Sequence, residues 1–444
     1  MRTSMLVGVI IAIGVIVTSA SVLAENDRLD QDTIQARIKV FGLENVDQRT
    51  GEIQKNKVVL SWLTHTTMAI AIQGRVVLTD TFIVRLETTP GRTPFVIKDV
   101  VDLHPEAIFI GHGHGDHADN AAFIAAKSGA RLFASEETCG VLQEDLTRMK
   151  ADLFMQADPD FAIPGATKIS CTPVTTTDST PGTQIVRLTP LEPVACIVAF
   201  RHLHSIAVPA DLDWPEMENL LKPLSADGNV PLLDWPDPRD ARLFPPGDPL
   251  TPSNPRRPGQ QNIRTGGNPG GPVSIWYHIV LRNGTNFTIA ANNTVGALKE
   301  GKGSGWDGTP ADGQRILDIL RRLPETDVQF GTASSGNTDF NGWRDHVYYL
   351  EALRPKIFLP GHAPVGASLQ YYSGFLATLR LMEEPRGNHW VGFPSDEWPS
   401  IRWLTDPSDT LKPIVFDVND RAWDSHGKDR RIAEFCSGPS RGPG

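Results

Sequence analysis

The chain has 444 residues and a formal net charge of -10 at pH 7, with 42 Lys and Arg against 52 Asp and Glu. Binding nucleic acid requires a concentration of positive charge that an acidic chain without clustered Lys and Arg does not offer. We therefore expect no nucleic-acid partner. The length exceeds that of a usual single core, which predicts one large domain with insertions or a domain with an appended segment.

The first 24 residues have the pattern of a secretory signal peptide. Arg2 precedes an apolar run over residues 5–17, and small residues lead to a cleavage site after Ala24. The run is shorter than the roughly 20 residues of a spanning helix, so cleavage is favoured over a membrane anchor. The sequence thus predicts an exported protein, secreted or periplasmic, with no stable membrane span after cleavage.

Short strands dominate the start of the predicted mature chain. Apolar and β-branched residues predict strands at 58–63, 68–72 and 75–79, with a turn at Gly74. A fourth strand is expected at 107–110. It leads into a glycine-interleaved loop and then a helix over 120–127, which Gly129 ends.

Strands and helices continue to alternate further along the chain. Strands are predicted at 130–134, 197–200, 273–281, 287–291 and 356–359, and helical spacing of apolar residues occurs at 314–323 and 343–353. This mixture indicates an α/β or α+β layered fold.

Two segments depart from this alternation. Residues 208–272 are rich in Pro and Gly and cannot hold a long regular element, so they form either a lid over a site or a surface insertion. The tail at 385–444 contains too many aromatic residues for a disordered linker and is expected to pack on the domain as a C-terminal extension.

Four cysteines lie far apart without C-x-x-C spacing: Cys139, Cys171, Cys196 and Cys436. An oxidising compartment would permit two disulfides, with three possible connectivities. Cys196 lies in an apolar run, where a buried free thiol fits the pattern at least as well as a bridge.

Four polar residues form the pattern H-x-H-x-D-H directly after a predicted strand: His112, His114, Asp116 and His117. Alternate residues of an extended segment point to the same side, so His112 and His114 can bind one ion. A turn at Gly115 lets Asp116 and His117 face a second ion. A packing role is disfavoured because burying such residues unpaired is costly. The motif therefore predicts a metal centre.

The motif resembles that of the metallo-β-lactamase superfamily, in which it lies on a loop of an αββα sandwich and holds one or two zinc ions. Ser61-Trp-Leu-Thr-His-Thr-Thr and Val77-Leu-Thr-Asp80 are most similar to the branch that contains ascorbate-6-phosphate lactonase and the N-acyl-phosphatidylethanolamine phospholipase D enzymes. The resemblance covers residues 58–362. It implies an α/β, four-layer αββα catalytic domain over residues 25–384, interrupted by the Pro/Gly-rich insertion.

The resemblance also implies that later strand ends supply the remaining metal ligands. His204, followed by Ser as in that branch, is the expected third ligand of the first ion. His202, two residues earlier and on the same face of the strand, is the alternative. His362, after Leu359-Pro-Gly, is expected to complete the second site with Asp116 and His117.

Two earlier residues match family positions outside the ligand set. Asp80, at the end of a predicted strand, resembles a family Asp that orients a ligand, and a turn role is its alternative. His65 occupies a family His position and either lines the cleft or supports a ligand.

One position departs from the family pattern. Where phosphodiesterase-like members carry an Asp that bridges both ions, the chain reads Ala291-Asn-Asn293-Thr. A neutral amide at Asn293 removes a negative charge from between two ions, and we expect this either to weaken the second site or to leave hydroxide as the sole bridge. Alignment on Asn292 instead leads to the same expectation.

The resemblance implies zinc-dependent hydrolysis. Zinc lowers the pKa of bound water to about 7, which makes hydroxide available, and Asp116 can orient that hydroxide or accept its proton. Because the bridging Asp is missing, we expect cleavage of an ester, lactone or amide bond, including that of a β-lactam, in a small-molecule substrate. The alternatives are a phosphodiesterase or phospholipase D-like hydrolase, which the branch favours, and a non-catalytic metal-binding module.

Overall fold

The computed structural model describes residues 29–83, 91–206, 270–333, 343–362, 399–404, 406–424, 428–437 and 440–441. The predicted signal peptide lies outside these residues, as do nearly all of the predicted insertion and the domain boundary expected at residue 384. Among the described residues, none of the helices combines the length and the hydropathy that crossing a bilayer requires.

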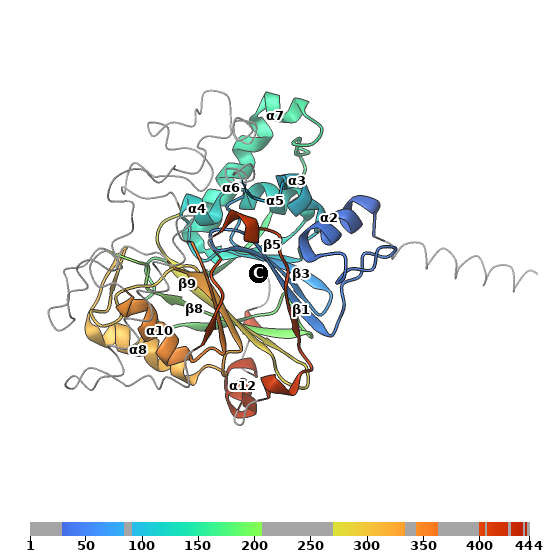
Figure 1. Cartoon of the computed structure of the whole chain (residues 1–444). Coiled ribbons are helices and arrows are strands. Elements are labelled where there is room, and N and C mark those ends of the chain that lie inside the picture. Colours follow the sequence, from blue (N-terminus) through green and yellow to red (C-terminus); the bar gives the residue numbers. More distant parts are fainter. Residues whose placement is uncertain are drawn as a thin grey trace, which may run out of the picture.

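Two large β-sheets lie at the centre of the molecule (Figure 1). The first has the strand order β16-β1-β2-β3-β4-β5-β6. β1 to β3 pair antiparallel as consecutive hairpins, whereas β3 to β6 pair parallel. The strands are β1 (Lys57–Thr64), β2 (Thr67–Ile72), β3 (Arg75–Thr79), β4 (Ala107–Phe109), β5 (Arg131–Ser135), β6 (Ser170–Thr175) and β16 (Ile414–Asp417).

The second sheet has the order β15-β14-β13-β10-β9-β8-β7-β17. β7 to β10 pair antiparallel, and β10, β13, β14 and β15 pair parallel. The strands are β7 (Ile185–Leu188), β8 (Ala195–His202), β9 (Ser274–Leu281), β10 (Thr288–Asn292), β13 (Val328–Thr332), β14 (Ile357–Gly361), β15 (Ser400–Ile401) and β17 (Ser440–Arg441). A separate hairpin consists of β11 (Lys302–Gly303) and β12 (Trp306–Asp307).

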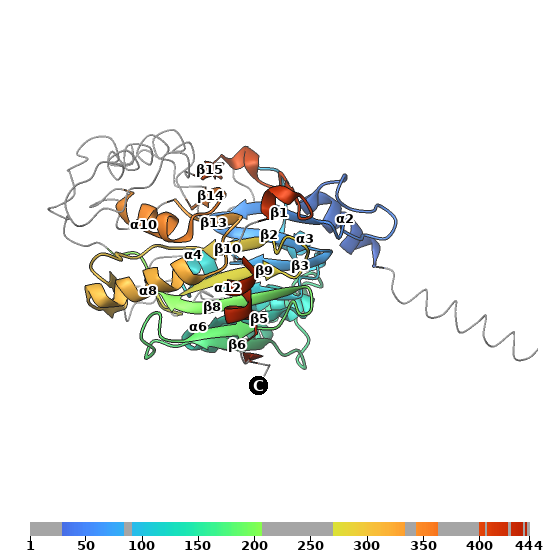
Figure 2. The ribbon, with the colours of Figure 1, turned by 90° about the horizontal axis from the view of Figure 1, so that it is seen from below.

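Helices cover the outer face of each sheet, as Figure 1 and Figure 2 show from two directions. The first sheet is covered by α2 (Gln31–Phe41), α3 (Ile97–Asp102), α5 (Ala121–Ser128) and α6 (Glu136–Ala151), which α7 (Leu153–Ala157) follows. The second is covered by α8 (Pro310–Arg322), α10 (Arg344–Leu353) and α12 (Lys428–Cys436). Shorter elements are α4 (Gly115–Ala118) and the 3-10 turns η5 (Pro407–Asp409) and η6 (Arg421–Trp423). The order helix, sheet, sheet, helix confirms the predicted αββα sandwich.

Alternating side chains along the strands divide the interior into three apolar layers. In β1, Val59 packs under the helices of the first sheet, whereas Val58 and Leu60 pack between the sheets. In β8, Ile197 faces the space between the sheets and Phe200 faces the helices of the second sheet. Successive side chains of a strand point to opposite faces, so strands buried on both faces are continuous apolar runs.

The C-terminal residues contribute strands to both sheets. β16 pairs antiparallel with β1 at the edge of the first sheet. β15 and β17 pair parallel with β14 and β7 in the second sheet. The described residues after 399 therefore form three of the four edges of the two sheets.

Two disulfides connect distant segments. Cys139 in α6 is bonded to Cys171 in β6, and Cys196 in β8 is bonded to Cys436 at the end of α12. The sequence left two states open for Cys196, a disulfide and a buried free thiol. The structure therefore shows the disulfide.

Candidate metal centre

The H-x-H-x-D-H motif leaves the first sheet at the end of β4. His112 and His114 lie on the loop after β4, and Asp116 and His117 lie on the short helix α4. Gly115 is the first residue of α4 and does not have a positive φ, so the expected turn is a helix start. His112 and His117 are each 1% exposed, although both are polar.

His112, His114 and His204 form one group of candidate ligands, whose ligand atoms all lie within 4.8 Å of one another. Nε2 of His112 is 3.2 Å from Nε2 of His204. The ring of His114 packs against both other rings, with centroid distances of 4.5 Å to His112 and 4.7 Å to His204. The first and second sheets therefore both contribute to this group.

The two Nε2 atoms that face each other carry lone pairs when the rings are neutral. Nδ1 of His204 donates to the carbonyl oxygen of Ser205 at 2.7 Å, and Nδ1 of His112 donates to Oδ1 of Asn293 at 3.2 Å. A neutral imidazole has one N–H, so each Nε2 is unprotonated. Two nitrogen ligands at about 2.0–2.1 Å from a tetrahedral zinc ion lie about 3.3 Å apart. The observed spacing and the facing lone pairs fit a shared cation.

Burial keeps the imidazoles of this group neutral. It holds the pKa of His112 well below the ordinary value, with the neighbouring imidazoles adding to the effect. It also lowers the pKa of His114 to about 4 and that of His204 to about 3. Neutral imidazole is the form that binds a metal ion.

Asp116, His362 and His65 form a second group, again with all ligand atoms within 4.8 Å of one another. Nε2 of His362, at the end of β14, lies 3.0 Å from Oδ2 of Asp116. His117 joins the two groups, because its Nε2 is 3.5 Å from the same carboxylate oxygen and its ring packs on that of His112. The rings of His117 and His362 stack with centroids 5.1 Å apart.

The charges of the second group are coupled. Burial raises the pKa of the Asp116 carboxyl, but the neighbouring His117 and the hydrogen bond from His362 outweigh it and hold this pKa well below its usual range. For His117, burial lowers the pKa, and the carboxylates of Asp116 and Asp80 more than compensate, so that the pKa is raised. A bound cation would compete with the proton on this imidazole.

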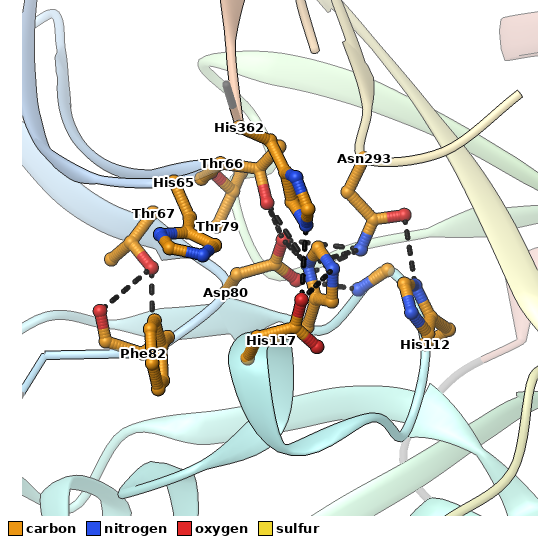
Figure 3. Close-up of polar contacts among 12 residues, drawn as sticks. His65, Thr66, Thr67, Thr79, Asp80, Phe82, His112, His117, Asn293 and His362 are labelled. Atoms are coloured by element: carbon orange, nitrogen blue, oxygen red, sulfur yellow. Dashed lines mark hydrogen bonds and ion pairs between the residues drawn. The ribbon is translucent and has the colours of Figure 1, made fainter. Parts of the chain in front are cut away.

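Asp80 lies at the end of β3, behind the ligand atoms (Figure 3). Its Oδ2 accepts from Thr66 Oγ1 at 2.6 Å and from His117 Nδ1 at 3.0 Å, and its Oδ1 accepts from the backbone N–H of Gly111 at 2.9 Å. The hydrogen bond to Nδ1 directs Nε2 of His117 toward Asp116. This is the arrangement expected of a carboxylate that orients a ligand.

Asn293 does not lie where the sequence interpretation put it. Its Nδ2 donates to both carboxylate oxygens of Asp80, at 3.2 and 3.1 Å, and its Oδ1 accepts from Nδ1 of His112 (Figure 3). The amide therefore contacts the rear of the imidazoles and not the side from which Nε2 would bind an ion. The expectation of a neutral group between two ions is wrong in its geometry, because the carboxylate of Asp80 and the ring of His112 hold the amide behind the centre.

The structure also separates His202 from His204. β8 ends at His202, whose Nδ1 lies 3.2 Å from the hydroxyl of Tyr349 and whose ring packs on Trp276. His202 thus faces the helices of the second sheet, and His204 reaches the centre because the chain leaves the strand before it. The two residues do not share a strand face, contrary to the sequence interpretation.

The other histidines of the described part lie away from this cluster. His278 lies 3.1 Å from the carbonyl oxygen of Pro324, His346 packs on Trp343, and His104 is exposed. Thr66 was not among the predicted site residues. A threonine in a turn between two strands has no pattern that would have distinguished it.

No family model matches the chain. A UPF0173 metal-dependent hydrolase from Methanopyrus kandleri is 32% identical over 73 residues, which is 16% of this chain and 29% of that protein. The matched part thus spans less than a third of the relative.

Solved structures with a similar arrangement include a metallo hydrolase from the archaeon Ignicoccus hospitalis (12% identity, 81% of this chain and 98% of that one, TM-score 0.40). A metallo-β-lactamase fold protein from Bacillus subtilis follows at 7% identity, 81% and 98% coverage and TM-score 0.37. A diiron β-hydroxylase from Streptomyces venezuelae matches at 11% identity, with 82% and 55% coverage and TM-score 0.37.

Proposed function

We propose that this chain, which has the metallo-β-lactamase fold, is a metal-dependent hydrolase that cleaves an ester, lactone or amide bond of a small-molecule substrate. The observation that carries the proposal is that Nε2 of His112 and Nε2 of His204 lie 3.2 Å apart, while Nδ1 of each ring faces an oxygen that can only accept a hydrogen bond. Facing lone pairs in a buried site repel each other unless a cation lies within reach of both.

The donor set supports zinc as the ion. His112, His114 and His204 offer three imidazole nitrogens to one position. Next to it, Oδ2 of Asp116 lies 3.0 Å from Nε2 of His362 and 3.5 Å from Nε2 of His117, so these residues offer ligands for a second ion. Imidazole with carboxylate suits zinc, and a set of three protein ligands leaves a position open for catalysis. When bound, the ion supplies a Lewis acid that polarises the scissile carbonyl and makes water nucleophilic near neutral pH.

The side chains of the protein orient the attacking water molecule and accept its proton. Asp116 is 36% exposed at its side chain and His362 is 24% exposed, whereas His117 is almost fully buried. The carboxylate of Asp116 therefore faces the accessible side of the centre, where it can orient a water molecule and accept its proton. Asp80 acts on His117 from behind and does not contact the reacting atoms in this proposal.

Export to an oxidising compartment, secreted or periplasmic, is part of the proposal. The signal-peptide pattern over residues 1–24 supports it. The pairing of all four cysteines supports it as well, because disulfides persist in oxidising compartments and are rare where thiols are kept reduced.

A substrate panel on purified protein tests the function. Lactone, nitrophenyl ester and β-lactam substrates are compared with a chromogenic phosphodiester, before chelation, after chelation and after zinc is restored. We expect turnover of a carboxylic ester, lactone or amide, at least a hundredfold loss on chelation, and recovery with zinc. Turnover of the phosphodiester alone would assign the chain to the phosphodiesterase alternative. Metal uptake without turnover of any substrate would favour a non-catalytic module.

A further inference from the structure

His65 lies at the turn between β1 and β2, and its ring is directed at the second group of candidate ligands. Its ligand atom is within 4.8 Å of those of both Asp116 and His362. The rings of His65 and His362 meet edge to face with centroids 4.7 Å apart. Among the described residues, His65 is thus the additional imidazole that reaches this group.

The backbone fixes His65 beside His362. The carbonyl oxygen of His65 accepts the backbone N–H of His362 at 3.2 Å and the indole N–H of Trp62 at 2.7 Å. A Cβ on Gly361 would lie 2.3 Å from this oxygen, so the contact depends on a glycine before His362. The end of β14 and the β1–β2 turn therefore meet directly at the centre.

Both histidines have a backbone conformation that is unfavourable for their type. φ is 45° at His65 and 53° at His362, in the left-handed region that residues other than glycine seldom adopt. Such conformations persist where surrounding contacts impose them, and they cluster at functional sites. Phe82 packs its ring 4.7 Å from that of His65, which further restricts the side chain.

We propose that His65 is a metal ligand, completing the second position together with Asp116 and His362. The inference rests on the proposed metal centre. The amide of Asn293 is held behind His112 by Asp80 and supplies no oxygen to the second position, whereas the imidazole of His65 reaches it. The imidazole of His65 thus gives the second position three protein ligands, the same number that the three histidines give the first.

Cobalt binding to variants at position 65 tests this inference without measuring activity. Metal-free protein is titrated with Co²⁺, and bound metal is counted after equilibration. The wild-type protein is expected to take up two equivalents, and His65→Asn to bind the second at least tenfold more weakly. Asparagine is chosen because it tolerates a left-handed backbone. The matched control is His104→Asn, at an exposed histidine with a φ of 47°.

A second variant gives a positive signal. In His65→Cys, a thiolate that coordinates Co²⁺ produces a sulfur-to-cobalt charge-transfer band, and His104→Cys does not. Urea unfolding of the metal-free variants checks that each is folded. Two equivalents bound by His65→Asn with unchanged affinity, absence of the band in a folded His65→Cys, or uptake of a single equivalent by the wild type would each overturn the inference. Two equivalents in the wild type and the expected results in both His65 variants, without hydrolysis of any substrate, would instead reject the proposed function and leave His65 as a ligand.

Discussion

The carboxylate of Asp80 is 1% exposed and receives hydrogen bonds from Thr66, Gly111, His117 and Asn293. Two of these donors are connected to candidate ligands: His117 donates directly, and Asn293 contacts His112 through its amide oxygen. One buried negative charge therefore sets the orientation of two imidazoles. Both rings keep a proton on Nδ1 and present Nε2 to the centre.

Asp80→Asn should weaken metal binding without removing a ligand. The amide is neutral and cannot compensate the partial charge on His117, so the ring loses its fixed orientation. Loss of such a supporting group typically costs about 10- to 100-fold in metal affinity. Competition with a chelator measures the change, and Asp160→Asn, at an exposed position, is the control. An affinity equal to that of the wild type would leave Asp80 with a turn role only.

Three buried histidines away from the centre make stability depend on pH. Burial lowers the pKa of His202, His278 and His346 to about 3. In the unfolded chain the same imidazoles take up a proton near pH 6.5, whereas in the folded chain they stay neutral down to about pH 3. The free energy of unfolding is therefore undiminished above pH 6.5 and decreases progressively as the pH falls from 6.5 toward 3. At pH 5 each costs on the order of 2 kcal/mol of the free energy of unfolding.

Replacing one of these histidines should reduce the sensitivity to acid. His278→Gln keeps a donor for the carbonyl oxygen of Pro324 and has no titrating group. Between pH 7 and pH 5 the variant is expected to lose about 2 kcal/mol less of its free energy of unfolding than the wild type. Urea unfolding at the two pH values measures the difference. Equal losses in both proteins would mean that His278 does not titrate differently on unfolding.

Residue patterns predicted the H-x-H-x-D-H metal motif but not the positions of the polar residues around it. The spacing of His112 to His117 identified the metal motif, but the positions of His202 and His204 depended on where β8 ends. A periodicity of two holds only while the strand continues, and the strand ends at His202. The position of Asn293 behind the ligands depends on its contact with Asp80, from a strand more than 200 residues earlier, which no local pattern encodes.

At the scale of elements, the loop after β4 depends on close backbone packing. A Cβ on Gly113 would lie 2.3 Å from the carbonyl carbon of Gly270, and a Cβ on Gly111 would lie 1.9 Å from the amide of Asn293. The N–H of Gly113 also donates to the carbonyl oxygen of Gly271 at 3.0 Å. Gly111 and Gly113 are therefore required by the approach of other segments and not by left-handed backbone.

Gly113→Ala should disturb this loop. The added methyl group overlaps backbone atoms that cannot rotate away, and such overpacking typically costs about 1–3 kcal/mol. We expect a lower free energy of unfolding and weaker metal binding, measured by urea unfolding and chelator competition. Gly140→Ala is the matched control, because a Cβ there meets nothing within 4 Å and alanine favours the helix α6. Equal effects of the two substitutions would contradict the packing argument.

The elements that could be predicted are those with a strong local pattern. The predicted strand at 75–79 coincides with β3, and those at 58–63 and 68–72 match β1 and β2 within a residue at each end. The helix α6 was missed although Leu142, Leu146 and Met149 have helical spacing and Ser135 caps it. β13 was missed for a physical reason: Val-Gln-Phe-Gly-Thr is short and is stabilised by parallel pairing on both sides rather than by its own alternation.

At the scale of the whole molecule, the candidate ligands come from both sheets. The loop after β4 and the β1–β2 turn belong to the first sheet, while His204 and His362 follow β8 and β14 of the second. The patterns of apolar residues were enough to predict an α/β or α+β layered fold, and the sandwich of two sheets came from the family resemblance. The meeting of these four strand ends could be predicted only from the family resemblance, because it depends on how the sheets pack.

A cation bound between the sheets should stabilise the sandwich as a whole. An ion that binds the folded chain alone, at a free concentration a hundred times its Kd, contributes about 2.7 kcal/mol. Because the unfolding entropy is about 2.1 cal/mol/K per residue, each kcal/mol raises the Tm of a domain of about 350 residues by about 1.4 °C. A rise of roughly 4 °C is therefore expected on adding zinc to chelated protein. Scanning calorimetry measures the shift.

The variant His204→Ala tests whether the bound ion stabilises the fold by linking the two sheets or by binding only to the H-x-H-x-D-H motif of the first sheet. Removing the imidazole of His204 leaves His112 and His114 of the first sheet without a ligand from the second sheet. Zinc should therefore raise the Tm of this variant much less than that of the wild type. His104→Asn, at an exposed position far from the ligands in the described structure, should keep the full rise. If His204→Ala kept it as well, the stabilising ion would be held by the loop after β4 and α4, and the packing of the two sheets would be independent of the metal.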